Sequence, residues 1–276
     1  MRKIICTALV VAGQLASASA SAYSSLSVGV ETLRYQELTT FINPTNPDFG
    51  KTLKTVSTIS SPVYRTSSLT KVNEQFEFSL DASSTLLPQD DTEVWTVDGI
   101  LRQTNQVDML HSSITLTGHY LLNKNHRFLA GPSYTLNTFR RFGFADPTLG
   151  VLEERSASVI LNFGYGYESE RSASKRFNYS AKILAGIPVY QLTENTAYPG
   201  FEFTDAGGYN IDIEGSVTYG VFDKLQVGVF ASYSFMKRDG ERIYTTQFTN
   251  VQSIVWPDNE TRIITGGLIL VWDFGE

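Results

Sequence analysis

The chain has 276 residues, of which 28 are acidic and 22 are basic. Residues 1–22 have the pattern of an export signal, with Arg2 and Lys3 before a short apolar run and small residues up to Ala22. Without this segment 20 basic residues stand against the same 28 acidic ones, a formal charge of −8 that argues against a nucleic acid partner.

The remaining residues, 23–276, are expected to form one exported domain. The single cysteine, Cys6, lies inside the signal, so no disulfide is expected. No run of eighteen apolar residues occurs, which excludes a transmembrane helix. Apolar and polar residues instead alternate along most of the chain, a pattern typical of β-strands.

In the first half, the alternation predicts four strands that are separated by polar segments. Their expected ranges are 26–31, 53–63, 73–81 and 110–120. Thr39–Lys51 contains two prolines and several turn-forming residues and is therefore expected to be a long loop. Ser83–Asp108 is polar and long, with a hairpin expected around Val94–Ile100.

In the second half, the alternation is more regular and predicts six further strands. Their expected ranges are 128–136, 157–167, 177–189, 209–219, 225–235 and 261–274. Long loops are expected at Arg140–Gly150, Gln191–Ala206 and Lys237–Glu260.

Short and long connections alternate along the chain. The short turns, 123–126, 169–175 and 221–224, would lie at one end of the fold and the long loops at the other. Outer-membrane barrels have this asymmetry, with short turns in the periplasm and long loops outside. The predicted fold class is therefore all-β, an antiparallel transmembrane β-barrel of about ten strands, with twelve as the alternative.

Aromatic residues support the membrane interpretation. If the short turns are periplasmic, many aromatic rings fall at the periplasmic end of the outward-facing rows, where a girdle at the lipid boundary is expected. This predicted girdle comprises Tyr120, Tyr167, Tyr179, Tyr219, Trp272 and Phe274. The last strand, which ends in an aromatic, also resembles the signal that Gram-negative barrels present to the barrel-assembly machinery. The predicted location is the cell outer membrane, with its lipid as a partner.

Charged residues on the opposite rows would point into the lumen. A barrel of this size has little interior room, so these side chains are expected to meet and fill it. The predicted lumen charge cluster comprises Glu31, Glu77, Arg127, Lys182, Asp212 and Glu214. Lys182 and the Asp212/Glu214 pair are expected on consecutive strands, where they could pair. A plugged polar lumen is therefore favoured over a conducting pore.

The order and spacing of these segments resemble those of the omptins, ten-stranded outer-membrane aspartate-type proteases. The resemblance rests on Trp95-Thr96 in a long polar segment, on the hairpin from Leu121 to Ala130, and on Ile264–Leu268 in the closing strand. It implies a ten-stranded barrel. In that family, two acidic pairs at the outer rim carry the activity, one Asp-x-Asp-like and one Asp-x-His.

The residues at the corresponding places argue against the activity. Asp90 and Asp91 are adjacent, so in a strand they point to opposite faces. The segment Gln191–Tyr198 contains Glu194 but no histidine, and without an imidazole the water-activating half of the site is missing. No catalytic residue is therefore predicted.

The histidines do not predict a metal site. His111 and His119 share one face of a strand but are separated by roughly 27 Å, and His126 lies in a turn. No metal or other cofactor is predicted.

The predicted function is contact with something outside the cell through the surface loops, without catalysis. Aromatic residues lie beside charges in Arg140–Phe144 and Trp256–Asp258, where lipopolysaccharide or an unidentified extracellular partner could bind. Two alternatives remain at this point: an omptin-like endopeptidase and a narrow porin-like channel.

Overall fold

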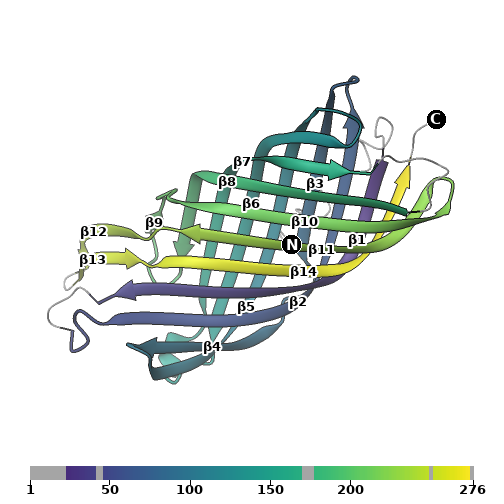
Figure 1. Ribbon diagram of the computed structural model, residues 1–276. Helices are drawn as coiled ribbons and strands as arrows, with labels where there is room; N and C mark the ends of the chain where they lie inside the picture. Colours follow the sequence, from purple (N-terminus) through teal and green to yellow (C-terminus); the bar gives the residue numbers. More distant parts are fainter. Residues whose placement is uncertain (1–22, 42–45, 170–176, 249–250, 274–276) are drawn as a thin grey trace.

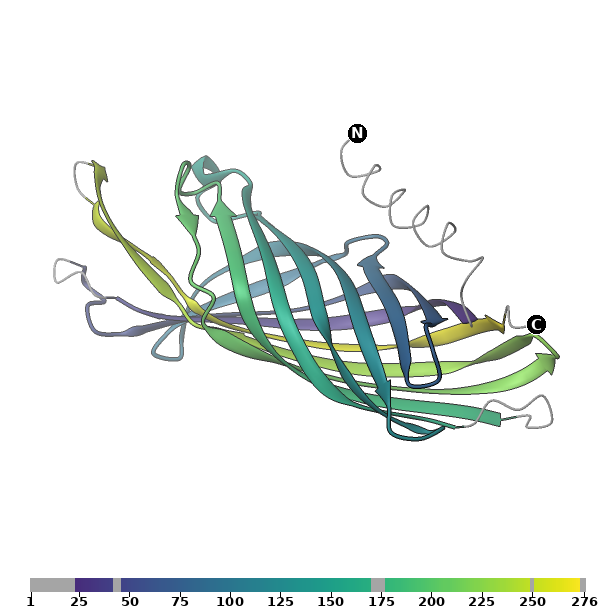
Figure 2. The same cartoon turned by 90° about the horizontal axis from the view of Figure 1, so that it is seen from above.

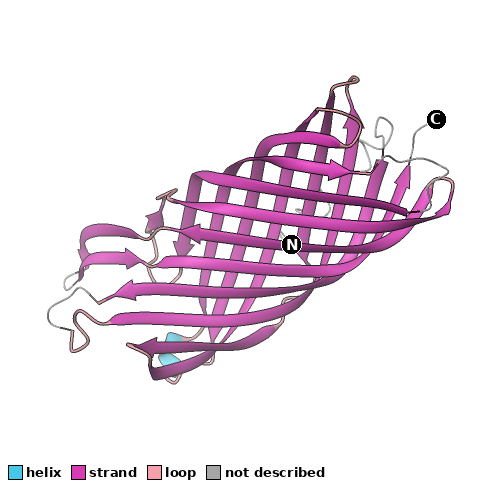
Figure 3. Ribbon diagram, in the orientation of Figure 1, coloured by secondary structure: helices cyan, strands magenta, loops and turns pink. Residues whose placement is uncertain are grey.

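A computed structural model describes residues 23–41, 46–169, 177–248 and 251–273 (Figure 1). The export signal and Phe274 lie outside these ranges. The strands are β1 (Tyr23–Thr40), β2 (Thr52–Lys71), β3 (Phe76–Thr85), β4 (Asp90–Val97), β5 (Ile100–Leu121), β6 (His126–Phe142), β7 (Leu152–Glu168), β8 (Phe177–Asn195), β9 (Glu202–Phe203), β10 (Gly208–Phe222), β11 (Leu225–Arg238), β12 (Glu241–Phe248), β13 (Val251–Trp256) and β14 (Asp258–Asp273). One short 3₁₀ helix, η1 (Pro147–Leu149), lies between β6 and β7 (Figure 3).

The main sheet closes into a barrel of ten antiparallel strand positions (Figure 2). β3 and β4 share one position, because both pair with β2 on one side and β5 on the other. β1 closes the sheet by pairing with β14, from Tyr23 opposite Asp273 to Leu38 opposite Asp258. β12 and β13 form a separate two-stranded sheet at the end of the barrel that carries the long connections, which is called the outer end because long loops are expected outside the cell (Figure 1). The predicted ten-stranded barrel is confirmed.

The side chains alternate between the outer surface and the lumen. On β7, Leu161 and Phe163 are 40% and 60% exposed, whereas Ile160 and Asn162, which alternate with them, are 1% and 2% exposed. Successive side chains of a strand point to opposite faces of the sheet, and the exposed apolar row therefore covers the outside of the barrel. In the described residues, no helix is long and apolar enough to cross a membrane.

Aromatic rings gather where the strands meet the short turns. Tyr167 and Tyr179 stack with their ring centroids 5.9 Å apart, and the Phe177 and Tyr219 rings meet edge to face at 5.0 Å. Tyr120 packs against a neighbouring strand in the same way, with its ring centroid 5.3 Å from that of Phe76. Rings at this level suit a boundary between lipid and water.

Several segments that were expected to be loops are strands. Most of Ser83–Asp108 belongs to β3, β4 and β5, and the expected hairpin is formed by β4 and β5. Its turn, Asp98-Gly99, has positive φ at both residues, 47° and 80°, as a two-residue hairpin turn requires. The barrel also continues through Phe142, Asn195 and Arg238. These outer ends carry polar residues on both faces, so their sequence lacks the alternation of a lipid-facing strand.

Candidate functional site

The inward-facing residues of β1 mark successive levels of the lumen. From the turn end to the outer end they are Ser27, Glu31, Leu33, Tyr35 and Glu37, all of them buried. Ser27 and Glu31 are polar, Leu33 and Tyr35 belong to an apolar group, and Glu37 is charged. The lumen therefore changes from polar to apolar and back to polar toward the outside.

The outermost layer, here named the rim cluster, is built around Arg141 of β6. Its guanidinium contacts the carboxylates of Glu37 at 2.9 Å, Glu93 at 3.0 Å and Glu154 at 3.1 Å. The four side chains are between 0% and 10% exposed. β6 and β1 are four positions apart in the strand order, so the pair with Glu37 crosses the lumen.

Neighbouring polar groups complete the hydrogen bonding of the rim cluster. The Tyr35 hydroxyl donates to Glu37 at 2.8 Å, and Thr55 donates to the same carboxylate at 3.2 Å. Asn105 and Trp95 donate to Glu93 at 3.0 and 3.1 Å. A buried ion pair is tolerated when its remaining polar atoms are bonded in this way.

Arg238 of β11 fills the other wall at this level. Its guanidinium donates to the Ser156 hydroxyl, and its Nε donates to the Met236 sulfur at 3.2 Å. Thr193, which is fully buried, donates to the same Ser156 at 3.0 Å. Side chains from both walls therefore occupy the mouth of the barrel.

An apolar layer lies directly beneath the rim cluster. Its buried members come from five strands and form one packed group. They are Leu33, Tyr35, Ile59, Val107, Met109, Phe139 and Ile263. The Tyr35 and Phe139 ring centroids are 4.3 Å apart. This layer separates the rim cluster from the polar lumen below.

A second ionic layer, here named the central cluster, crosses the middle of the lumen. Lys182 of β8 lies 3.2 Å from Asp81 of β3 and 3.6 Å from Glu214 of β10. Glu214 also pairs with Arg65 of β2, whose guanidinium lies 5.0 Å from the Phe230 ring centroid. Each of the two long pairs, Lys182–Asp81 and Arg65–Glu214, joins strands that are four positions apart.

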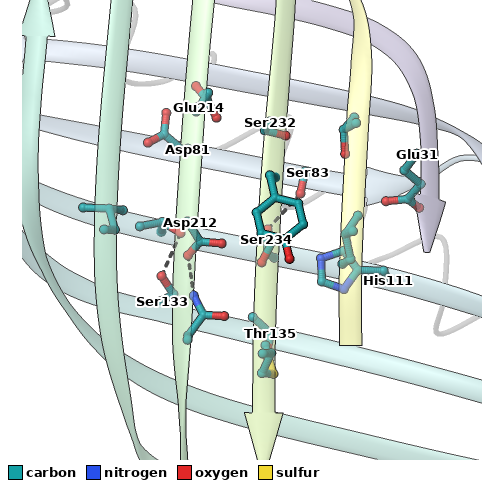
Figure 4. Close-up of a pocket in the computed structure, with 18 of the residues that line it drawn as sticks. Glu31, Asp81, Ser83, His111, Ser133, Thr135, Asp212, Glu214, Ser232 and Ser234 are labelled. Atoms are coloured by element: carbon teal, nitrogen blue, oxygen red, sulfur yellow. Dashed lines mark hydrogen bonds between the residues drawn. The ribbon is translucent and has the colours of Figure 1, made fainter. Parts of the chain in front are cut away.

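The central cluster separates two cavities. The upper chamber, of about 140 Å³, lies between it and the apolar layer and is shown in Figure 4. The lower chamber, of about 130 Å³, lies on the turn side and contains Arg127, which pairs with Glu77 at 3.0 Å and Glu168 at 2.8 Å. His111 lines the upper chamber and His119 the lower one, so the two rings lie in different cavities.

The structure brings the predicted lumen charges into three groups. Lys182 and Glu214 meet in the central cluster, and Arg127 and Glu77 meet below it. Glu31 and Asp212 line the upper chamber.

The predicted acidic residues of the outer end do not form a site. Asp90 lies opposite Asp108, and Asp91 lies opposite the fully buried Val107, so the two carboxylates leave β4 on opposite faces. Glu194 is exposed on β8.

Sequence reasoning missed the rim cluster. Glu93 and Arg141 lie in segments for which the sequence predicts loops, and Glu37 and Glu154 lie six and three residues outside the predicted strands. Continuing the two-residue alternation through these segments would have placed all four side chains in the lumen.

No protein-family profile and no curated protein sequence matches the chain. Among solved structures, it is similar to the outer membrane protease OmpT from Escherichia coli, with a TM-score of 0.68 and 11% identity over 91% of this chain and 96% of that one. The outer membrane protein OprG from Pseudomonas aeruginosa (TM-score 0.39, 10% identity, 92% and 97%) and Ail from Yersinia pestis (TM-score 0.27, 11% identity, 90% and 99%) are more distant.

These observations define a class of protein. The chain is an outer-membrane β-barrel with ten strand positions, and its architecture is omptin-like. The predicted location in the outer membrane agrees with this fold and with the apolar outward-facing rows. At 11% identity the likeness to OmpT shows the fold alone.

Proposed function

We propose that this protein is a non-catalytic outer-membrane barrel, that its lumen is plugged and that its outer loops contact lipopolysaccharide or another extracellular partner. The rim cluster is the observation that carries this proposal. Arg141 holds three carboxylates at the outer mouth of the barrel. Carboxylates that are paired with an arginine and buried in this way do not hold or deprotonate a water.

An omptin-like endopeptidase is the first alternative. Such a site needs a carboxylate pair that faces a histidine–carboxylate pair. The wall formed by β8 carries Gln191 and Thr193 at the outer end, both buried, and the described histidines lie in the lumen chambers or at a short turn. This arrangement favours a barrel without proteolytic activity.

A narrow channel is the second alternative. The rim cluster, the apolar layer and the central cluster each join strands on different sides of the lumen. A permeating solute would have to separate several buried ion pairs and an apolar contact in succession. These layers favour a plugged lumen.

Two sets of contacts hold the outer loops in place. Trp256 is 4% exposed and packs on Phe203 with the ring centroids 4.9 Å apart, so the expectation that it is an exposed contact residue is wrong. Glu241 accepts hydrogen bonds from the backbone N–H groups of Thr204 and Asp205, at 2.6 and 3.0 Å. The loop after β8 is thereby fixed to the base of the β12–β13 hairpin and presents a stable outer surface.

The outward face above the apolar rows carries basic residues that suit lipopolysaccharide. Arg34 and Arg262 lie directly opposite each other on β1 and β14, and the Arg262 guanidinium lies 5.6 Å from the Phe235 ring centroid. Like charges opposite each other on a sheet are destabilising, and the Glu260 carboxylate, 3.2 Å from the Arg262 guanidinium, offsets only part of this repulsion. An anionic group that bridged them would offset this repulsion, and phosphate is the group that arginine pairs bind well.

A peptidase assay tests the absence of catalysis. Refolded protein supplied with lipopolysaccharide is expected to leave fluorogenic dibasic peptides intact. The Asp90→Ala and Asp91→Ala variants serve as matched controls. Cleavage by the unaltered protein that is lost in either variant would restore the endopeptidase assignment.

A conductance measurement tests the plug. In planar bilayers, the unaltered protein is expected to produce no stable current steps. The Arg141→Ala variant, which opens the rim cluster, serves as the comparison. Regular current steps from the unaltered protein would instead support the channel.

A further inference from the structure

The upper and lower chambers of the lumen differ in their charge. The upper chamber is lined by two basic residues, Arg65 and Lys182, and by four acidic ones. These are Glu31, Asp81, Asp212 and Glu214. With His111 neutral, the formal charge of the lining is −2. The lower chamber is lined by three basic residues and three acidic ones, a formal charge of zero with His119 neutral.

The excess negative charge belongs to Glu31 and Asp212. Asp81 and Glu214 are paired with Lys182 and Arg65 in the central cluster, but Glu31 and Asp212 make no ion pair with any residue that the structure describes. Glu31 accepts a hydrogen bond from Thr85 and is 4% exposed.

Within the described residues, the charges of the two carboxylates are not neutralised by an ion pair. Lys182 and Arg65 interact with Asp212 electrostatically without forming an ion pair with it, and so offset its charge only in part. Asp212 accepts a hydrogen bond from Asn210. Burial of an unpaired charge is costly, because hydroxyl and amide groups replace hydration but do not supply a counter-charge.

The same chamber holds buried polar atoms that have no protein partner. The Thr135 hydroxyl and the Asn210 Oδ1 atom are buried and make no hydrogen bond within the described residues. Their residues are 6% and 4% exposed, and both line the chamber. Both oxygens can accept, and an amide oxygen can only accept.

His111 adds a further acceptor to the chamber. Its Nδ1 lies 2.7 Å from the Asn137 Oδ1. Because this oxygen can only accept, Nδ1 carries the proton and the Nε2 of the neutral ring is left as an acceptor. Figure 4 shows Glu31 and His111 on one side of the chamber and Asp212 on the other.

We propose that the upper chamber binds a small monovalent cation, an alkali ion or an ammonium group, between Glu31 and Asp212. The negative charge and the oxygen acceptors supply what such an ion needs, and a cavity of about 140 Å³ accommodates it with a few waters. Within the described ranges, no three His, Cys, Asp or Glu side chains lie close enough to hold a metal ion directly. Because Glu31 and Asp212 lie on different sides of the chamber, their carboxylates do not form a compact set of ligands, which favours a singly charged ion over a tightly coordinated divalent one.

Thermal unfolding in different salts tests the proposal. Purified, folded protein in detergent would be heated in chloride salts of sodium, potassium, ammonium or N-methylglucamine at equal ionic strength, and folded protein would be followed by gel mobility. N-methylglucamine is too large for the chamber. The midpoint is expected to be at least about 3 °C higher with a small cation, because a bound ion stabilises only the folded state.

The variant that carries both Glu31→Gln and Asp212→Asn removes the excess negative charge of the upper chamber and keeps the size and shape of both side chains. It is expected to unfold at the same temperature in all four salts. Its midpoint in N-methylglucamine should equal or exceed that of the unaltered protein. Glu194→Gln, an exposed acid on β8, is the matched control and should keep the full salt effect. Persistence of the small-cation effect in the double variant would overturn the proposal.

Two further experiments identify the bound ion: unfolding in additional salts and a crystal soak. Stabilisation by methylammonium as well as sodium assigns an amine-accepting site, and stabilisation by sodium and potassium alone assigns an inorganic ion. Crystals soaked in thallium(I) are expected to show an anomalous peak in the upper chamber and none in the lower one. Stabilisation by calcium alone, or a peak confined to the lower chamber, would contradict the assignment.

Discussion

The rim cluster and the central cluster both cross the lumen with ion pairs, but their surroundings differ. The four charged side chains of the rim cluster are at most 10% exposed, and an apolar layer packs beneath them. Those of the central cluster are 20–28% exposed, with a cavity on each side. The rim cluster is a dry seal, whereas the central cluster is a partition between two polar spaces.

The effect of an ion pair inside a barrel therefore depends on the space around it. A dry cluster offers no room for an ion or a water to replace a lost partner. A cluster that borders cavities can exchange a side chain for solvent. Loss of a charged partner should therefore destabilise the protein more in the rim cluster than in the central cluster.

Removal of the rim arginine should have the largest effect. Arg141→Met leaves three buried carboxylates without their cation and is expected to lower the free energy of unfolding by about 3–5 kcal/mol. Denaturant unfolding in detergent or lipid would measure the loss. Adding Glu37→Gln, Glu93→Gln and Glu154→Gln to the variant should restore most of it. A loss below about 1 kcal/mol would show that the rim cluster is solvated.

Substitutions on the lipid-facing wall give a cost in folding free energy that does not depend on either ionic cluster. Leu161→Arg or Ile213→Arg places a charge near the middle of the apolar band and should cost about 2–4 kcal/mol in folding free energy. Leu161→Met is the neutral control. Asp212→Asn, on the lumen face next to Ile213, should cost much less. Equal sensitivity of the two faces would show that the lipid and lumen sides have been exchanged.

Removal of the central lysine should have a smaller effect than removal of Arg141. Lys182→Met leaves Asp81 and Glu214 beside cavities that water can enter, and Glu214 keeps its contact with Arg65. The expected loss is about 1–2 kcal/mol, between that of a surface pair and that of a buried one. A loss equal to that of Arg141→Met would remove the distinction between seal and partition.

An exposed ion pair should have the smallest effect. Asp48 lies 2.7 Å from Lys51 and 3.0 Å from Arg102 in the loop after β1, distances as short as those in the rim cluster. The hydrogen bond from Lys51 and the charge of Arg102 lower the pKa of this carboxyl. Asp48→Asn should leave the unfolding midpoint unchanged at neutral pH, since solvent screens such pairs.

The pH dependence of this exposed pair has a defined sign. A lowered folded-state pKa contributes stability that is present above the unfolded value, near pH 4, and is lost as the pH falls through the folded value. Any difference between the unaltered protein and Asp48→Asn should therefore shrink below about pH 4. A difference that grows in acid would reverse the assigned sign.

The sequence alone predicted the strands correctly wherever they faced lipid, because there an apolar residue occurs at every second position. The strands at Ala157–Tyr167, Phe177–Val189 and Leu225–Phe235 lie inside β7, β8 and β11. The outer ends of the strands were missed, because water contacts the outside of the barrel there and both faces carry polar residues. The outward-facing positions beside Glu93 and Arg141 include Thr92, Thr96, Thr138 and Arg140, so no continuous apolar row indicated which way these two side chains point.

The candidate site depended on contacts between distant strands. The sequence placed Lys182 and Glu214 on neighbouring strands, where they lie opposite each other. It did not indicate that Asp81 would reach Lys182, or that Arg65 would reach Glu214, because these partners are 101 and 149 residues apart. Such pairs form only when the sheet closes and opposite walls come within the length of two side chains.

The alternation of apolar and polar residues was enough to predict the barrel, its lipid-facing surface and the polar character of the lumen. This information is local, since a strand turns successive side chains to opposite faces wherever it lies. The closed barrel was needed to see which charges meet, that Arg141 seals the rim, and that Glu31 and Asp212, among the described residues, form no ion pair around a cavity. Those outcomes depend on the register and diameter of the closed barrel, which no single strand encodes.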